Sequence, residues 1–94
     1  MNSKSIYKIP GGKLVKISLE YDENNNTIYS VKITGDFFAY PEEAIETLEN
    51  SLKNTEIKKE IVLKKINSLI SSNNIEFIGL NAEGITEAIM RCLQ

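Results

Sequence analysis

Two alternating runs of apolar and polar residues most constrain what this chain can fold into. Residues 14–21, LVKISLEY, place an apolar side chain at every second position, and residues 29–34 repeat the pattern with Tyr29 as the first inward residue. A period of two is typical of a strand with one buried face. The intervening DENNN at 22–26 is rich in residues that form turns. The two runs therefore predict an antiparallel hairpin with one face in the core.

The rest of the chain predicts short strands and then helices. Residues 6–9 can form a first strand, which ends before Pro10 because proline has no amide hydrogen to donate. Residues 36–39 either continue the hairpin or form a short strand, and residues 75–80 could form another. Strands followed by helices indicate an α+β fold, an antiparallel sheet of about three to four strands with three helices packed on one face.

Three helices are predicted in the second half of the chain. Pro41 suits the first position of the first helix. Its apolar side chains are Ile45, Leu48 and Leu52. The second helix is expected over residues 57–70, with these side chains toward the core: Ile57, Ile61, Val62, Ile66, Leu69 and Ile70. Asn81 can cap the third helix. Its apolar side chains recur at helical spacing: Ile85, Ala88, Ile89, Cys92 and Leu93.

The composition favours one small intracellular domain. The chain has 94 residues, of which 41% are hydrophobic and 26% charged, and these values are ordinary for globular proteins. Its net charge of −2 argues against a nucleic-acid partner, and no long apolar run predicts a signal peptide or a membrane span. One cysteine excludes an internal disulfide. We expect a single domain over residues 1–94, located in the cytoplasm.

Few side chains could build a catalytic or metal site. Histidine is absent, and a single cysteine without histidine cannot assemble a zinc or iron–sulfur centre. The adjacent carboxylates of Glu42 and Glu43 are better explained as negative charge at a helix N-terminus. Cys92 falls on the apolar face of the last helix, which favours a core position over a reactive thiol. No catalytic residue and no metal ligand is therefore assigned.

The segment Gly11-Gly12-Lys13 is the first candidate for function. Two glycines can expose consecutive amides as an anion-binding nest, and the lysine adds a positive charge that suits a phosphate or an adenylate. The spacing of a P-loop is absent. The competing interpretation is a glycine hairpin turn with an exposed lysine.

The segment Asp36-Phe37-Phe38, followed by Tyr40, is the second candidate. Neighbouring side chains alternate along an extended segment, so at most one of the two phenylalanines can face the core. The other would form, with Tyr40, a small apolar patch of the kind that interfaces use. A bend at Gly35 that buries both rings is the competing interpretation.

These motifs resemble the small C-terminal, or accessory, domain of lipoate–protein ligases. The resemblance rests on PGGKLV at residues 10–15, GDFFAYPEE at 35–43 and GLNAEGITEAIMRCL at 79–93. It implies a small domain whose fold is similar to that of the SufE/NifU scaffold proteins. Because the chain begins with Met1 shortly before the first predicted strand and ends on its last helix, we expect the separately encoded small subunit of a two-part ligase, or a paralogue of the small domain.

The resemblance also implies a function. Lipoate–protein ligases activate lipoate with ATP to lipoyl-AMP and then transfer the lipoyl group to a lysine of an acceptor domain. The catalytic lysine and the nucleotide pocket belong to the large subunit, so this chain is expected to be inactive alone. It would form a heterodimer with that subunit and serve lipoyl-domain acceptor proteins through the complex, where ATP, Mg and lipoate are expected.

The family motif and the apolar patch give a set of residues expected near the adenylate or at the partner interface. These candidates are Gly11, Gly12, Lys13, Asp36, Phe37, Phe38 and Tyr40. The alternative function is a non-catalytic scaffold or interaction module of SufE/NifU-like fold. A buried Cys92 would weigh against a scaffold for iron–sulfur assembly, which needs an accessible thiol.

Overall fold

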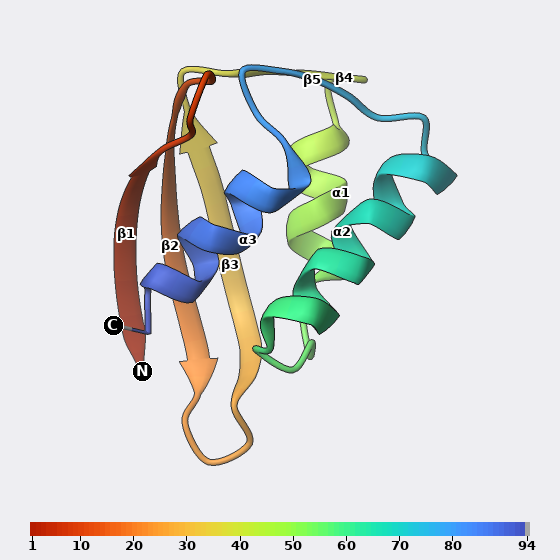
Figure 1. Ribbon diagram of the computed structural model, residues 1–94. Coiled ribbons are helices and arrows are strands. Elements are labelled where there is room, and N and C mark those ends of the chain that lie inside the picture. Colours follow the sequence, from red (N-terminus) through yellow and green to blue (C-terminus); the bar gives the residue numbers. More distant parts are fainter. Residues whose placement is uncertain (94) are drawn as a thin grey trace.

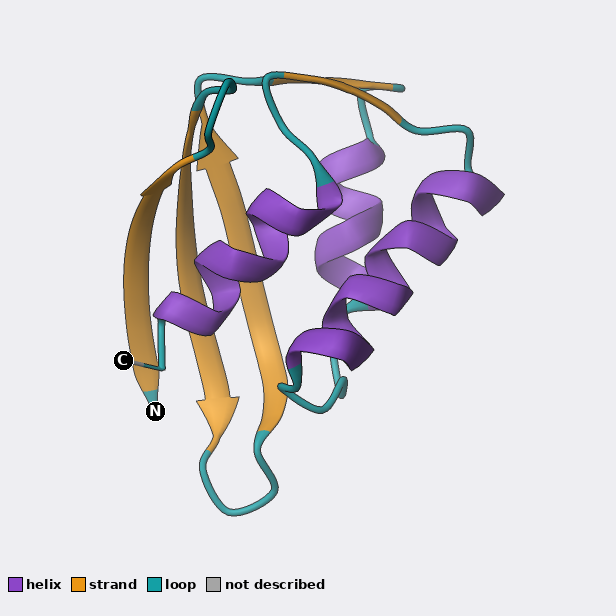
Figure 2. Ribbon diagram, viewed as in Figure 1, coloured by secondary structure: helices purple, strands orange, loops and turns teal. Residues whose placement is uncertain are grey.

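A three-stranded antiparallel sheet carries three helices on one of its faces over residues 1–93, the part of the chain that the computed structural model describes (Figure 1). The elements are β1 (Asn2–Lys8), β2 (Leu14–Asp22), β3 (Thr27–Gly35), β4 (Phe38–Tyr40), α1 (Ala44–Ser51), α2 (Lys59–Ser72), β5 (Glu76–Ile78) and α3 (Ala82–Arg91). The sheet order is β1-β2-β3, while β4 and β5 pair with each other at one end of the molecule (Figure 2). The predicted α+β architecture is confirmed, with the short strands forming a separate ribbon.

The core lies between the sheet and the helices. Helix α3 packs across β1 and β2, α1 packs against β3, and α2 packs against α3. The sheet contributes the alternating side chains of the predicted hairpin, and each helix contributes one apolar face. Among the most buried members are Val15, Ile17, Leu19, Ile28, Leu48, Ile66, Ile85 and Ile89. Among the described helices, none combines the length and the apolar character required to cross a bilayer.

Strand β1 begins at Asn2, four residues before the predicted 6–9, and ends at Lys8. The prediction missed its first half because the inward side chains there are polar. The hydroxyl of Ser3 donates to the carbonyl of Cys92, and the hydroxyl of Ser5 donates to the carbonyl of Ala88 at 2.6 Å. A search for alternating apolar residues overlooks such a strand. Its serines join the edge of the sheet to α3 through hydrogen bonds in place of apolar packing.

The predicted alternation of β3 is wrong at Tyr29, which is 68% exposed, while Ile28 is 1% exposed. The register explains the difference. Leu19 pairs with Val31, but Tyr21 pairs with Ile28, so β3 contains one extra residue at this point. Such a β-bulge reverses the facing of the residues beyond it. Ile28 therefore joins the core and Tyr29 points to solvent.

Helix α1 begins at Ala44, three positions after the predicted start. The amide of Ala44 donates to the carbonyl of Pro41 at 2.9 Å, so residues 41–43 form a turn before the helix. Glu42 and Glu43 lie exposed in this turn, directly ahead of the positive end of the helix. The predicted apolar face is confirmed, since Leu48 and Leu52 are fully buried and Ile45 packs against the core.

Helix α2 begins at Lys59 because the preceding segment pairs with the hairpin. The amide of Ile57 donates to the carbonyl of Asn26 at 2.8 Å, which leaves Ile57 buried in an extended segment. Val62 is buried as predicted, but Ile61 is 38% exposed. Adjacent helical residues are turned by about 100°. The side of α2 that faces the core is centred on Val62 and Ile66, and Ile61 lies at the margin of that side.

The outer edge of β3 is covered by side-chain and backbone groups. The carboxylate of Glu49 in α1 accepts a hydrogen bond from the amide of Ile33 at 2.8 Å. Nearby, the amide of Ile28 donates to the carbonyl of Thr55 at 2.9 Å, and the amide of Asn54 donates to the carbonyl of Ile28 at 2.7 Å. These bonds satisfy polar groups that an edge strand otherwise exposes.

Thr55 offers a test of the packing in this region. It is 6% exposed, and its hydroxyl has no hydrogen-bond partner among residues 1–93. Valine has nearly the same shape and no hydroxyl to desolvate, so Thr55→Val is expected to stabilise the fold by about 1 kcal/mol. For a domain of this size the melting temperature should rise by about 4–8 °C in thermal denaturation followed by circular dichroism. As a control, Thr55→Ser keeps the hydroxyl and loses the methyl group, so it should lower the melting temperature. A melting temperature of the Thr55→Val variant below that of the unsubstituted chain would contradict this account.

Candidate partner interface at the glycine hairpin and the β4–β5 ribbon

The turn between β1 and β2 is joined to the chain that follows β5. Within the turn, the amide of Gly12 donates to the carbonyl of Ile9 at 2.8 Å. The amide of Lys13 then donates to the carbonyl of Gly79 at 2.9 Å. The two candidate segments of the sequence, the glycine hairpin and the junction after β3, therefore lie at the same end of the molecule (Figure 1).

The hydrogen bonds contradict an anion nest at the hairpin. The amides of Gly12 and Lys13 both donate to backbone carbonyls and cannot also bind an anion. The Lys8 ammonium donates to the carbonyls of Gly12 at 2.6 Å and Ile9 at 3.1 Å. The hairpin interpretation is the one the structure supports. Lys13 itself is exposed, with its aliphatic carbons lying against Gly79.

Gly35 permits the sharp exit from β3 toward β4. Its φ is +153°, a conformation that residues with a side chain rarely adopt. A Cβ at this position would lie closer than 3.0 Å to the backbone carbonyl oxygen of Leu14. The amide of the exposed residue Asp36 donates to that same carbonyl at 3.2 Å. The strand end and the junction are thus held in close backbone contact that only glycine allows.

The two phenylalanines of the junction separate as predicted. Phe37 packs against the core, whereas Phe38 is 74% exposed. The competing interpretation, in which both rings are buried, is therefore wrong. Phe38 is paired across the ribbon with Ile78, which is 69% exposed, and Tyr40 is also 69% exposed.

Residues two apart on a strand, and residues directly opposite on its partner, share one face of the sheet. Phe38, Tyr40 and Ile78 therefore form one exposed apolar surface, which we call the ribbon patch. Sequence reasoning missed Ile78. The sequence allows a short strand within 75–80, but only the pairing of β5 with β4 shows that Ile78 lies opposite Phe38.

A groove between α2 and α3 is poorly suited to a nucleotide. It has a volume of about 450 Å³, and its charged lining residues are Lys59, Glu83 and Glu87. These residues provide two carboxylates and one ammonium, and Glu87 is paired with Arg91, so the groove has no excess of positive charge to hold phosphate groups. The N-terminus of α3 beside it is already capped as predicted, because Asn81 accepts a hydrogen bond from the amide of Gly84 at 2.6 Å.

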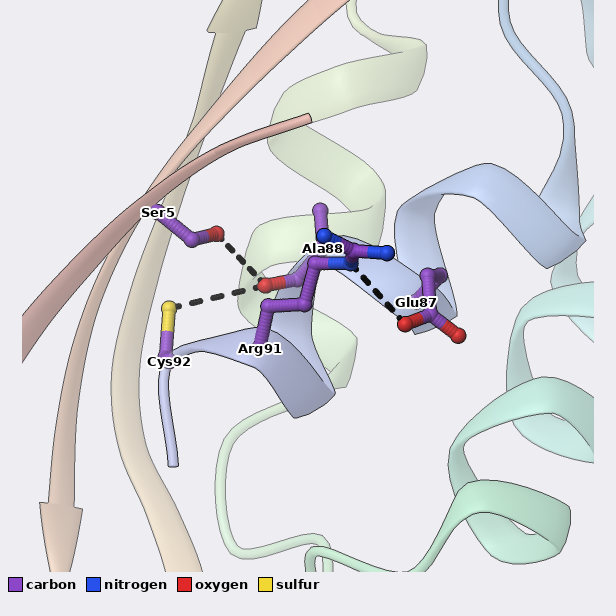
Figure 3. Close-up of polar contacts among 5 residues, drawn as sticks. All are labelled: Ser5, Glu87, Ala88, Arg91 and Cys92. Carbon is purple, nitrogen blue, oxygen red and sulfur yellow. Dashed lines mark hydrogen bonds and ion pairs between the residues drawn. The ribbon is translucent and has the colours of Figure 1, made fainter. Parts of the chain in front are cut away.

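Cys92 is a core residue, as the sequence predicts. Its thiol is buried and donates to the carbonyl of Ala88 at 3.6 Å, beside the hydroxyl of Ser5 (Figure 3). Burial raises the pKa of the Cys92 thiol, although a hydrogen bond with Ser5 opposes the shift. On the exposed side of α3, Arg91 donates to Glu87 at 3.0 Å. An inaccessible, protonated thiol argues against a scaffold for iron–sulfur clusters.

Three comparisons with known proteins all find similarity to parts of lipoate protein ligases. The sequence model of the bacterial lipoate protein ligase C-terminus matches residues 4–89. The chain is 39% identical over 46 residues to lipoate-protein ligase A subunit 2 of Thermoplasma acidophilum, a match that covers 49% of this chain and 47% of that protein. This sequence match therefore spans about half the length of the curated relative.

The fold comparison extends further. The structure superposes with a TM-score of 0.73 and 26% identity on a chain from a structural study of an archaeal lipoylation system. That study describes a bipartite lipoate protein ligase and its E2 lipoyl domain from Thermoplasma acidophilum, and the match covers 95% of this chain and 92% of that one. Since the sequence model of the family matches most of the chain, this protein belongs to the family of lipoate protein ligase C-terminal domains.

Proposed function

We propose that this chain is the small subunit of a bipartite lipoate–protein ligase. The observation that carries the proposal is the correspondence, over nearly the whole length of both chains, with a chain from the study of a bipartite ligase. The subunit would be required with a large catalytic subunit for the ATP-dependent activation of lipoate. In that reaction a lipoate carboxylate oxygen attacks the α-phosphorus of ATP and releases pyrophosphate, and an acceptor lysine later displaces AMP.

Two features support a non-catalytic role for the chain alone. The sequence contains no histidine, and the α2–α3 groove has no excess of positive charge. Binding and orienting ATP needs a site that stabilises phosphoryl charge. We therefore assign the nucleotide, Mg and lipoate sites to the large subunit.

The ribbon patch supports the assignment of a protein partner. Three large apolar side chains lie exposed next to one another, and exposed aromatic groups are typical anchors of protein interfaces. Lys13 lies at the same end, where its ammonium could reach the adenylate or a nucleotide-binding loop of the large subunit. Gly11, Gly12 and Asp36 would shape this end of the interface.

Reconstitution tests the proposal directly. The chain alone, a large subunit alone and the mixture are each given lipoate and ATP, and pyrophosphate release is measured. We expect release only from the mixture, because this chain lacks the substrate sites and, on our proposal, the large subunit needs the small subunit beside it to position both substrates. Transfer from preformed lipoyl-AMP to a lipoyl domain should depend much less on the small subunit. Pyrophosphate release by the small subunit alone, or full activity of the large subunit without it, would contradict the proposal.

A further inference from the structure

The sheet face opposite the helices carries a cluster of lysines. Lys4 of β1 and Lys32 of β3 lie on either side of Ser18 of β2, since both pair with that residue. In the next row of the same face, Lys16 pairs with Ile6. All three lysines are exposed, and no ion pair among residues 1–93 involves them. We call Lys4, Lys16, Lys32 and Ile6 the open face.

The open face differs in charge from the rest of the molecule. The chain as a whole has a net charge of −2, yet in the described sheet this face carries only two acidic residues, Glu20 and Asp22, at the C-terminal end of β2. Like charges at neighbouring sheet positions destabilise a sheet. Lysines on an edge strand can prevent unwanted strand pairing. That explanation covers Lys4, but it does not cover Lys16, which lies on the central strand β2.

The open face also has an apolar centre. Ile6 is 64% exposed, although it lies on a strand between polar neighbours. A shallow groove of about 290 Å³ is lined by residues of all three strands and includes Ile6 and the three lysines. An apolar residue surrounded by charged groups is the usual arrangement of a protein interface, with its apolar core and polar rim.

We propose that the open face binds a protein surface rich in carboxylates, with an apolar side chain of the partner seated against Ile6. Charge complementarity carries the assignment, because carboxylates are the protein groups whose charge complements three exposed ammonium groups that have no ion pair in the described chain. A protein is favoured over nucleic acid and membrane, since three lysines form too small a basic area for a polyanionic track on an acidic chain. This surface is distinct from the ribbon patch and does not depend on the proposed function.

Two matched charge-reversal variants test the proposal. The face variant combines Lys4→Glu, Lys16→Glu and Lys32→Glu. The helix variant combines Lys59→Glu, Lys64→Glu and Lys65→Glu, which are exposed on α2 and change the net charge by the same amount. Thermal denaturation of both variants shows whether the fold is retained. The probe is fluorescently labelled poly-L-glutamate, titrated with the full chain and followed by anisotropy.

We expect the chain to bind poly-L-glutamate with an affinity that falls as the salt concentration increases. The affinity should be reduced about tenfold or more in the face variant and less than about twofold in the helix variant. Duplex DNA and phosphatidylserine vesicles serve as competing anionic surfaces. The proposal is overturned by absence of binding at low salt, by an equal loss in both variants, or by tighter binding to DNA or vesicles. A labelled copolymer of glutamate and leucine supplies the apolar side chain that poly-L-glutamate lacks. Ile6→Ala should weaken binding of this copolymer without a change in salt dependence, and an unchanged affinity would overturn the proposed contact at Ile6.

Discussion

Replacing Gly35 by alanine is expected to lower the free energy of unfolding by about 3 kcal/mol, a large fraction of the stability of a small domain. The backbone φ of +153° is strained for any residue with a Cβ. The new methyl group would also collide with the backbone carbonyl of Leu14, which accepts a hydrogen bond from the amide of Asp36 and lies next to the Val15–Gly35 pair, so its movement would disturb this end of the hairpin. Equilibrium urea denaturation measures the change.

Gly11→Ala is the matched control for this prediction. Gly11 also has a positive φ, +72°, but a Cβ built there has no atom within 4 Å. The substitution should therefore cost about 1 kcal/mol, the value expected from backbone strain alone. Equal losses for the two variants would show that the contact with Leu14 is relieved by small backbone shifts.

Replacing Phe38 by alanine is expected to weaken association with the large subunit by about 2 kcal/mol, or about 30-fold in Kd. The ring is 74% exposed in the free chain, so its loss should leave the free energy of unfolding nearly unchanged. Phe37→Ala should do the reverse, because its ring packs against the core and its removal leaves a cavity. Isothermal titration calorimetry and urea denaturation of the same two variants separate binding from folding.

Tyr29→Ala provides a control for aromatic exposure as such. Tyr29 is 68% exposed but lies at the β-bulge of β3, away from the ribbon patch. The Tyr29→Ala substitution should alter neither association with the large subunit nor the adenylation of lipoate. If Phe38→Ala and Tyr29→Ala leave the affinity for the large subunit equally unchanged, the ribbon patch is not the interface, although the small-subunit function would still stand on the reconstitution experiment.

Local patterns predicted the strands and helices but not the contacts between distant segments. The alternation over residues 14–21 is enough to identify β2, because one face of that strand is buried along most of its length. The exposure of Tyr29 depends on the register between β2 and β3, which no local pattern contains. The start of α1 depends on a turn that closes on the carbonyl of Pro41.

The candidate site, like the fold, was predictable where it depends on neighbouring residues and not where it depends on contacts between distant segments. Strand geometry predicts that one phenylalanine of the junction is exposed, and the structure adds that Ile78 lies opposite it. The anion nest was inferred from residue types alone. It is contradicted because the amide of Lys13 finds its acceptor at Gly79, a residue far away in the sequence. The open face was missed for the same reason, since its three lysines come together only when three strands pair.

The carboxylate of Glu49 has a consequence for how this protein can assemble. By accepting the hydrogen bond of the Ile33 amide, it occupies a donor that an incoming strand would need. The bonds of Ile28 to residues 54 and 55 block the other end of the same strand. Extension of the three-stranded sheet by β-augmentation is therefore blocked at β3, whereas the edge strand β1 has no such cover among the described residues. A partner that approaches β3 must recognise side chains, and Glu49→Ala is the change that would open β3 to intermolecular strand addition.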